Sequence, residues 1–167
     1  VGAGRVLVKA PNWLTHVDYD VASPAWGPTI DRLAQHFRFV RYDARGNGLS
    51  DWSSGAADFP TAVRDLGAVI DQIGAEKVSI LGLSQGAATA AAYAAANPRR
   101  VDCLFLHGGY ARGRHRRGDE MDIKKSALIE SLIMTGWGND NPVYLNALAS
   151  LFTPSASPDQ IRSDSFS

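Results

Sequence analysis

Residues 82–86 read Gly-Leu-Ser-Gln-Gly, which places one serine between two glycines in the pattern G-x-S-x-G. A serine hydroxyl is a poor nucleophile unless it is exposed and held by a base. A sharp turn from a strand into a helix would expose Ser84, and glycine on both sides avoids Cβ clashes in such a turn. The helix would begin at Gln85, whose backbone N–H can stabilise an oxyanion. The pattern predicts Ser84 as the nucleophile of an elbow formed with Gly82 and Gly86; the alternative is a glycine-rich turn without chemistry.

The segments around this serine alternate between short apolar runs and amphipathic stretches. Such alternation is typical of parallel strands joined by helices. A β-branched run leads directly into Gly82, and an alanine-rich helix is expected over residues 85–97. Four strands are expected, at residues 5–9, 39–42, 77–83 and 101–106.

Capping residues indicate two further helices in the first part of the chain. Ser23 as N-cap with Pro24 in the first turn predicts one helix. Asp58 as N-cap and Gly74 as the terminating residue predict another between them. After the fourth strand the pattern changes to a basic loop and two helices, which are expected over residues 119–135 and 142–152.

Length and composition narrow the class of protein. The chain has 167 residues, of which 45% are hydrophobic and 20% charged, and its formal net charge is zero. This length and hydrophobic content suffice for one buried core. Without a basic excess, no nucleic-acid partner is expected for this domain. No apolar run reaches the roughly 18 residues that cross a membrane, so no membrane partner is expected. The single cysteine, Cys103, cannot form an internal disulfide, and the cytoplasm is the expected location.

A second motif precedes the serine by one helix and one strand. Residues 42–50 resemble the D-x-R-G-x-G-x-S segment that follows the fourth strand in many α/β-hydrolases. Its two glycines, Gly46 and Gly48, permit turns with positive φ. Asp43 and Arg45 are interpreted as structural residues that tie the loop together. Two ordered motifs at this interval are more specific than either alone.

The resemblance implies the α/β fold class: an α/β-hydrolase core of parallel strands with crossover helices over residues 1–110, and a partial helical lid or cap over residues 111–167. The core corresponds to strands three to six of the family fold, so the chain is expected to be truncated at both ends. In the family the triad runs Ser, acid, His along the chain. The one carboxylate between Ser84 and His107 is Asp102, which is expected at the entering end of a strand and so at the wrong face. Both partners are therefore expected beyond Ser167, and the truncated chain is expected to be inactive. All four histidines are interpreted as structural or exposed.

The family resemblance also implies an activity. It is that of a serine hydrolase acting on an ester or related carbonyl substrate, small and hydrophobic, through an acyl-enzyme and without metal or other cofactor. Ser84 would be catalytic, and the backbone N–H groups of Trp13 and Gln85 would form the oxyanion hole, with Asn12 as the alternative to Trp13. Dehalogenases and soluble epoxide hydrolases have aspartate in place of Ser84, which disfavours their mechanisms here.

Three stretches look like a narrower bacterial group, in which a hydrolase-like domain is joined to a LuxR-type DNA-binding domain or an adenylate cyclase domain. They are residues 9–16, 41–52 and 107–114. This resemblance implies an alternative function, a non-catalytic domain that senses a small ligand for an attached regulator or cyclase. The family's strand order places the second and fourth strands at sheet edges, so self-association through exposed edges is also expected.

Overall fold

The computed structural model describes residues 1–13, 15–24, 26–53, 58–113, 116, 120–136, 141, 143–144, 146–147 and 150. The chain forms two compact units, Val1–Ala111 and Arg112–Ser167. In the described part of the chain, no helix is both long and apolar enough to cross a membrane.

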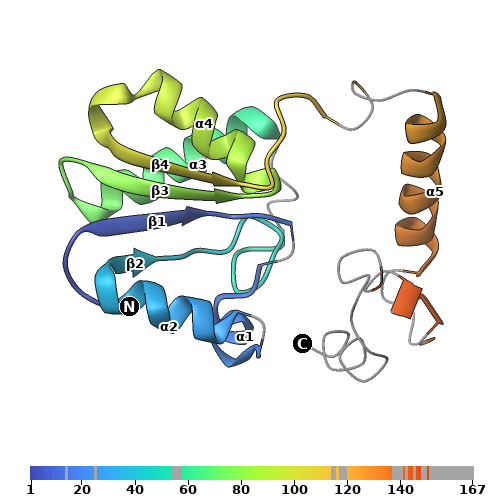
Figure 1. Ribbon diagram of the computed structural model, residues 1–167, viewed down its shortest axis with the longest axis horizontal. Helices are drawn as coiled ribbons and strands as arrows, with labels where there is room; N and C mark the ends of the chain where they lie inside the picture. Colours follow the sequence, from blue (N-terminus) through green and yellow to red (C-terminus); the bar gives the residue numbers. More distant parts are fainter. Residues whose placement is uncertain are drawn as a thin grey trace. The chain divides into compact units, whose positions relative to one another are not determined.

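The first unit is built on one sheet of four parallel strands (Figure 1). The order across the sheet is β2 (Arg38–Val40), β1 (Val6–Ala10), β3 (Val78–Leu83) and β4 (Val101–His107). The predicted α/β class with parallel strands and crossover helices is confirmed. The second and fourth strands lie at the edges, as expected, although Phe39 on the outer edge of β2 exchanges two backbone hydrogen bonds with Val1. Self-association through these edges stays a prediction.

Helices cover both faces of the sheet (Figure 1). The helices α3 (Phe59–Ile73) and α4 (Gln85–Ala96) pack on one face, while α1 (Val17–Ala22) and α2 (Gly27–His36) lie on the other. Side chains alternate along β1, so Val8 joins the core with α3 and α4, and Leu7 joins the core with α2. The central strands are thus buried on both sides.

The helix α3 begins and ends at the capping residues that the sequence predicted. The Asp58 carboxylate accepts a hydrogen bond from the Thr61 backbone N–H, with 2.8 Å between the two atoms. Gly74 ends the helix in the left-handed conformation, at φ 73°. Leu66 and Ile70 on its inner stripe are fully buried.

The helix predicted from Ser23 is present but begins later, at Gly27, although Ser23 accepts hydrogen bonds from the Trp26 and Gly27 N–H groups. The preceding residues form their own short helix, α1, which His16 caps by accepting a hydrogen bond from the Tyr19 N–H. Ser23 is the C-cap of α1, and α2 begins at Gly27 with a proline in its first turn. A serine followed by proline fits the end of one helix and the approach to the next, and local sequence does not separate these two readings. The expected strand 39–42 also ends earlier, at Val40.

The second unit contains the helix α5 (Glu120–Gly136), close to the predicted range of 119–135. Gly136 packs against Tyr144 so closely that an added Cβ would lie 2.7 Å from the tyrosine Cβ. The described residues of the other predicted helix, 142–152, are helical, and the rest of it lies outside the described residues.

Candidate active site

Ser84 lies in a strained turn between β3 and α4. Its backbone has φ 49° and ψ −118°, and among the described residues it is the only non-glycine with positive φ. Such a conformation costs about 1–3 kcal/mol and persists only where the surrounding structure imposes it. The residue is exposed at the carboxyl end of β3. The structure therefore places the Ser84 side chain where the sequence pattern predicted it.

The two flanking glycines have no room for a side chain. A Cβ at Gly82 would lie 2.6 Å from the Cα of Ala87 and 2.9 Å from the Gly86 carbonyl oxygen. A Cβ at Gly86 would lie 2.7 Å and 2.8 Å from the carbonyl oxygens of Ala10 and Pro11. The first clash involves the α4 backbone and the second involves the loop after β1. Both glycines are thus needed for the bend.

The start of α4 supplies backbone donors beside the serine. Gln85 is the first residue of a 12-residue helix, so its N–H has no acceptor within the helix, and the helix dipole favours negative charge there. The Ser84 N–H itself donates to the His107 carbonyl at the end of β4, 2.9 Å away. The role of Gln85 in an oxyanion hole agrees with this placement and stays a prediction.

The segment after β4 approaches the serine more closely than the sequence indicates. A Cβ on Gly109 would lie 2.4 Å from the Ala87 Cβ and 3.9 Å from the Ser84 carbonyl oxygen. The approach is made by the pair Gly108–Gly109, with Gly108 at φ 62° and Gly109 against Ala87 in the first turn of α4. A glycine pair directly after a strand is the only sequence signal for it.

The loop after β1 carries the other predicted donor. The close approach of Gly86 to Ala10 and Pro11 brings this loop against the start of α4. Trp13 follows on the loop and is 37% exposed. The Asn12 side-chain amide donates to the Trp13 carbonyl at 3.2 Å. The loop and the elbow are therefore neighbours, whereas the choice between Trp13 and Asn12 as donor stays a prediction.

The loop after β2 is held by the residues interpreted as structural. The buried Asp43 carboxylate accepts from the backbone N–H groups of Val17 and Leu49. Arg45 forms two hydrogen bonds with Asp65 of α3, at 2.6 and 2.7 Å. A Cβ at Gly48 would overlap the Asp43 carboxylate. These contacts agree with the structural interpretation of Asp43 and Arg45.

A buried lysine, Lys9, lies at the end of β1 and was also missed. Its side chain is on the face of the sheet that carries Leu7, and the residue is 7% exposed. Burial lowers the pKa of Lys9, an effect that Asp20 opposes and Arg41 reinforces. Burial likewise raises the pKa of Asp20, while Lys9 and Arg41 act to lower it. The sequence signal was a lysine in an otherwise apolar strand.

The histidines serve as structural or surface groups where they are described. His16 caps α1 and packs against Tyr19, with ring centroids 4.2 Å apart. His36 is the last residue of α2. His107 is the last residue of β4, and it is exposed. His115 lies outside the described residues. No cluster that could ligate a metal is present among the residues the structure describes.

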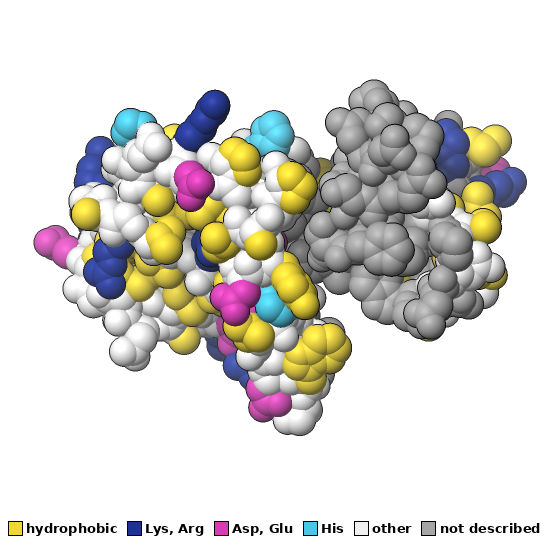
Figure 2. All heavy atoms as spheres, turned by 90° about the horizontal axis from the view of Figure 1, so that it is seen from below, with side chains coloured by type: hydrophobic (Ala, Val, Ile, Leu, Met, Phe, Trp, Pro, Cys, Tyr) yellow, Lys and Arg dark blue, Asp and Glu magenta, His cyan; other side chains and the backbone are white. Residues whose placement is uncertain are grey.

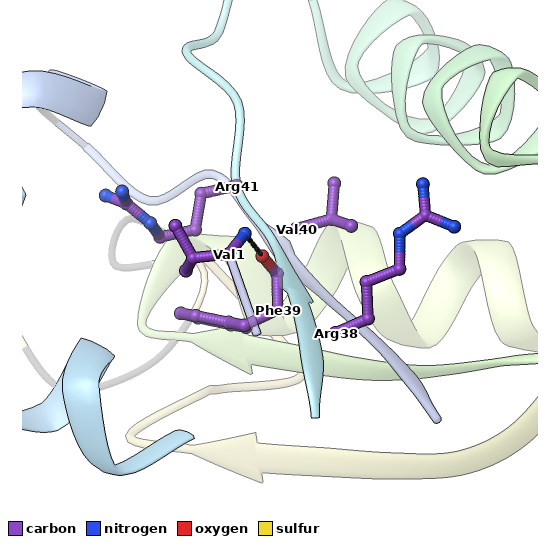
Figure 3. A pocket seen from close by; sticks show the side chains of 5 residues that line it. All are labelled: Val1, Arg38, Phe39, Val40 and Arg41. Carbon is purple, nitrogen blue, oxygen red and sulfur yellow. Dashed lines mark hydrogen bonds between the residues drawn. The ribbon is translucent and has the colours of Figure 1, made fainter. Parts of the chain in front are cut away.

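One hollow of the first unit lies away from the elbow. A hollow of about 250 Å³ lies along β2 and is lined by Val1, Arg38, Phe39, Val40 and Arg41 (Figure 3). Because β1 separates β2 from β3, this hollow is not beside Ser84. Seen from the side of α1 and α2, hydrophobic side chains are scattered among charged ones (Figure 2). The site is therefore identified by backbone geometry.

Comparison with known proteins identifies the family. A family described as "alpha/beta hydrolase fold" matches residues 17–141, which is more than half of the chain. The chain belongs to the α/β-hydrolase fold family. The match includes the Ser84 elbow and the Asp43 loop, and it begins after the loop that follows β1.

Relatives of this α/β-hydrolase have several hydrolytic activities. A putative carbamate hydrolase RutD from Agrobacterium fabrum is 27% identical over 129 residues, covering 77% of this chain and 49% of that protein. A soluble epoxide hydrolase from Corynebacterium sp. is 28% identical over 125 residues, or 75% and 42% of the two chains. The solved esterase from Exiguobacterium antarcticum superposes with a TM-score of 0.63 and 26% identity, covering 91% and 55%.

The chain spans about half the length of the curated relatives it matches. These relatives are hydrolases, and the narrower resemblance to hydrolase-like domains of regulators and cyclases stays a prediction. The triad acid and histidine stay predictions as well.

Proposed function

We propose that the protein is a serine hydrolase that cleaves an ester or related carbonyl substrate through a covalent acyl-enzyme. The observation that carries this proposal is the backbone of Ser84, held at φ 49° at the exposed end of β3. Strain of this kind is retained where it presents a side chain for chemistry. The elbow, the start of α4 and the loop after β1 meet at this point.

The proposed reaction begins with attack of the Ser84 hydroxyl oxygen on the substrate carbonyl carbon. A histidine base, supplied by a part of the protein outside these residues, takes the hydroxyl proton and gives it to the leaving group. The carbonyl oxygen becomes an oxyanion, which the backbone N–H groups of Gln85 and Trp13 stabilise. Removing one such donor typically lowers kcat by about 10²–10³, so the position of each donor matters. A water molecule then gives a proton to the same base and attacks the acyl carbon; the bond to the Ser84 oxygen breaks, the acid product leaves and the proton returns to that oxygen.

The serine distinguishes this proposal from epoxide hydrolysis, despite the similarity to an epoxide hydrolase. Epoxide opening in this family proceeds by an aspartate nucleophile, and position 84 is serine. We therefore propose that the substrate carries an acyl carbon and not an epoxide ring. No metal or organic cofactor enters the proposed reaction, and the cytoplasm stays the predicted location.

A fluorophosphonate probe tests the proposal on the complete protein that carries this sequence. We expect wild-type protein to be labelled at Ser84, and Ser84→Ala to lose the label together with ester hydrolysis. Ser79→Ala is a matched control, because Ser79 is buried within β3 and should keep the label. Equal labelling of wild-type protein and Ser84→Ala would remove Ser84 from the mechanism.

The Ser84→Ala variant also distinguishes hydrolysis from the alternative function, which is ligand sensing. A sensing domain would release its ligand chemically unchanged, and the output of an attached regulator or cyclase would survive Ser84→Ala. A hydrolase would convert the ligand and lose this activity in the variant. Mass spectrometry of the ligand after incubation distinguishes the two.

A further inference from the structure

Lys9 occupies a position at which an apolar side chain would be expected. It is two residues after Leu7 on β1, on the face that packs against α2, and it is 7% exposed. Taking an ammonium group out of water is costly unless nearby groups compensate it. Apolar residues of similar volume often replace buried charges without loss of stability. A buried lysine next to the candidate site therefore needs an explanation beyond packing.

The contacts of Lys9 lead toward the loop after β1. The Lys9 Nζ donates to the Asn12 Oδ1 at 2.6 Å. The Nζ also lies 5.7 Å from the ring centroid of Trp26, within cation–π range. The Asn12 amide nitrogen in turn donates to the Trp13 carbonyl at 3.2 Å. The Asn12 side chain thus connects the end of the strand to the backbone of the loop.

The other charges that act on Lys9 make contacts elsewhere, although the buried Oδ1 of Asp43 has no hydrogen-bond partner. Asp20 of α1 lies 3.6 Å from the guanidinium of Arg41, which also donates to the Val17 carbonyl. The Asp43 carboxylate accepts backbone hydrogen bonds from the α1 and Gly48 loops. These groups hold α1 and the loop after β2 in place, and their charges act on the Lys9 ammonium. The hydrogen bond of Lys9 itself goes to Asn12.

We propose that Lys9 is a positioning residue for the oxyanion loop, acting through Asn12 on the backbone of Trp13. The inference rests on the proposed function and assigns Lys9 a part in that same site. An oxyanion donor contributes only when it is fixed where the charge develops, and a displacement of about 1 Å can cost about 10²-fold in rate. The relay from Lys9 to Asn12 to Trp13 restricts this loop from the buried end of β1.

Variants of Asn12 separate the two halves of the relay. Asn12→Ala removes both the acceptor for Lys9 and the donor to Trp13. Asn12→Asp keeps an acceptor for Lys9 but replaces the donor by an oxygen that repels the Trp13 carbonyl. If the relay positions the loop, Asn12→Asp should be as impaired as Asn12→Ala. If the Lys9–Asn12 contact only stabilises the fold, Asn12→Asp should behave like wild type, because it retains an ionic partner for the lysine.

The experiment uses the complete protein and two readouts. The first is the rate of fluorophosphonate labelling at Ser84, which we expect to fall at least about tenfold in Lys9→Met, Asn12→Ala and Asn12→Asp. The second is hydrogen exchange of the backbone amides of Ala10, Asn12 and Trp13, which we expect to become at least about fivefold faster in the same variants. Lys77→Met is the matched control: Lys77 is exposed at the opposite end of β3, and both readouts should match wild type.

A double variant tests whether Lys9 and Asn12 act as one unit. Lys9→Met combined with Asn12→Ala should label no more than about twofold more slowly than the slower single variant, because the relay is broken once. Rates that multiply would overturn the proposal. If Lys9→Met does not fold, the Asn12 variants decide the question, since Asn12 is half-buried on a loop.

The two proposals fail in different ways. Absence of Ser84 labelling in wild-type protein contradicts the proposed function, and exchange of the same three backbone amides still tests whether Lys9 positions the loop. Normal labelling of Asn12→Asp, with unchanged exchange of these three amides, overturns the role of Lys9 and leaves the nucleophile in place.

Discussion

The elbow and the loop after β1 lie side by side but are held in place by different means. The elbow depends on the lack of side chains at Gly82 and Gly86, because neighbouring backbone occupies the space that a Cβ would need. The loop is fixed by polar side chains, through the hydrogen bonds from Lys9 to Asn12 and from Asn12 to Trp13. The elbow therefore depends on sterics and the loop on electrostatics.

This difference decides how each region should respond to change. A steric constraint is insensitive to pH and salt, and a single methyl group violates it. A hydrogen-bonded relay changes with the charge and geometry of its members, and it can loosen while the fold stays intact. We therefore expect elbow substitutions to alter folding and relay substitutions to alter the loop.

The largest effect is expected from adding a methyl group within the elbow. In Gly82→Ala the new Cβ would lie 2.6 Å from the Ala87 Cα and 2.9 Å from the Ala90 Cβ, so strand and helix must separate. We expect the free energy of unfolding to fall by about 3 kcal/mol or more, as measured by urea titration. Gly113→Ala is the control, because nothing lies within 4 Å of that position. Equal stability of the two variants would mean that the bend is not tightly packed.

A smaller effect is expected from relieving the strain at the serine. Ser84→Gly and Ser84→Ala both lack the hydroxyl, but only glycine adopts φ 49° without steric cost. We expect Ser84→Gly to unfold with a free energy about 1 kcal/mol higher than Ser84→Ala. Thermal and urea unfolding of the pair measure the difference. A more stable alanine variant would show that the backbone at this position is relaxed.

The smallest effect concerns the titration of Lys9. Burial lowers the pKa of Lys9 in the folded protein below its ordinary value of 10.5. At a pH between the lowered pKa and 10.5, the unfolded chain therefore carries a proton on Lys9 that the folded chain lacks. The free energy of unfolding of wild type, relative to Lys9→Met, should therefore rise with pH toward 10.5. Tyr42, whose pKa burial raises, titrates in both proteins and cancels in the comparison. A flat or falling difference in urea midpoints would contradict the burial of a charged Lys9.

The same contrast explains what the sequence could predict. The elbow was predictable because its constraint is local: five consecutive residues specify a strand end, a bend and a helix start. The Asp58 and Gly74 caps of α3 were predictable for the same reason. The Lys9 relay was not, because the burial of Lys9 depends on α1, α2 and the loop after β2. The boundary at Ser23 failed because serine and proline fit both the end of α1 and the start of the next helix.

The most direct test of the central claim is a crystal structure of the complete protein after reaction with a fluorophosphonate. We predict a covalent bond from the Ser84 hydroxyl oxygen to phosphorus, with Ser84 still at positive φ. The phosphonyl oxygen should accept hydrogen bonds from the backbone N–H groups of Gln85 and Trp13. A Ser84 side chain packed inside the protein, or an adduct on another residue, would contradict the account.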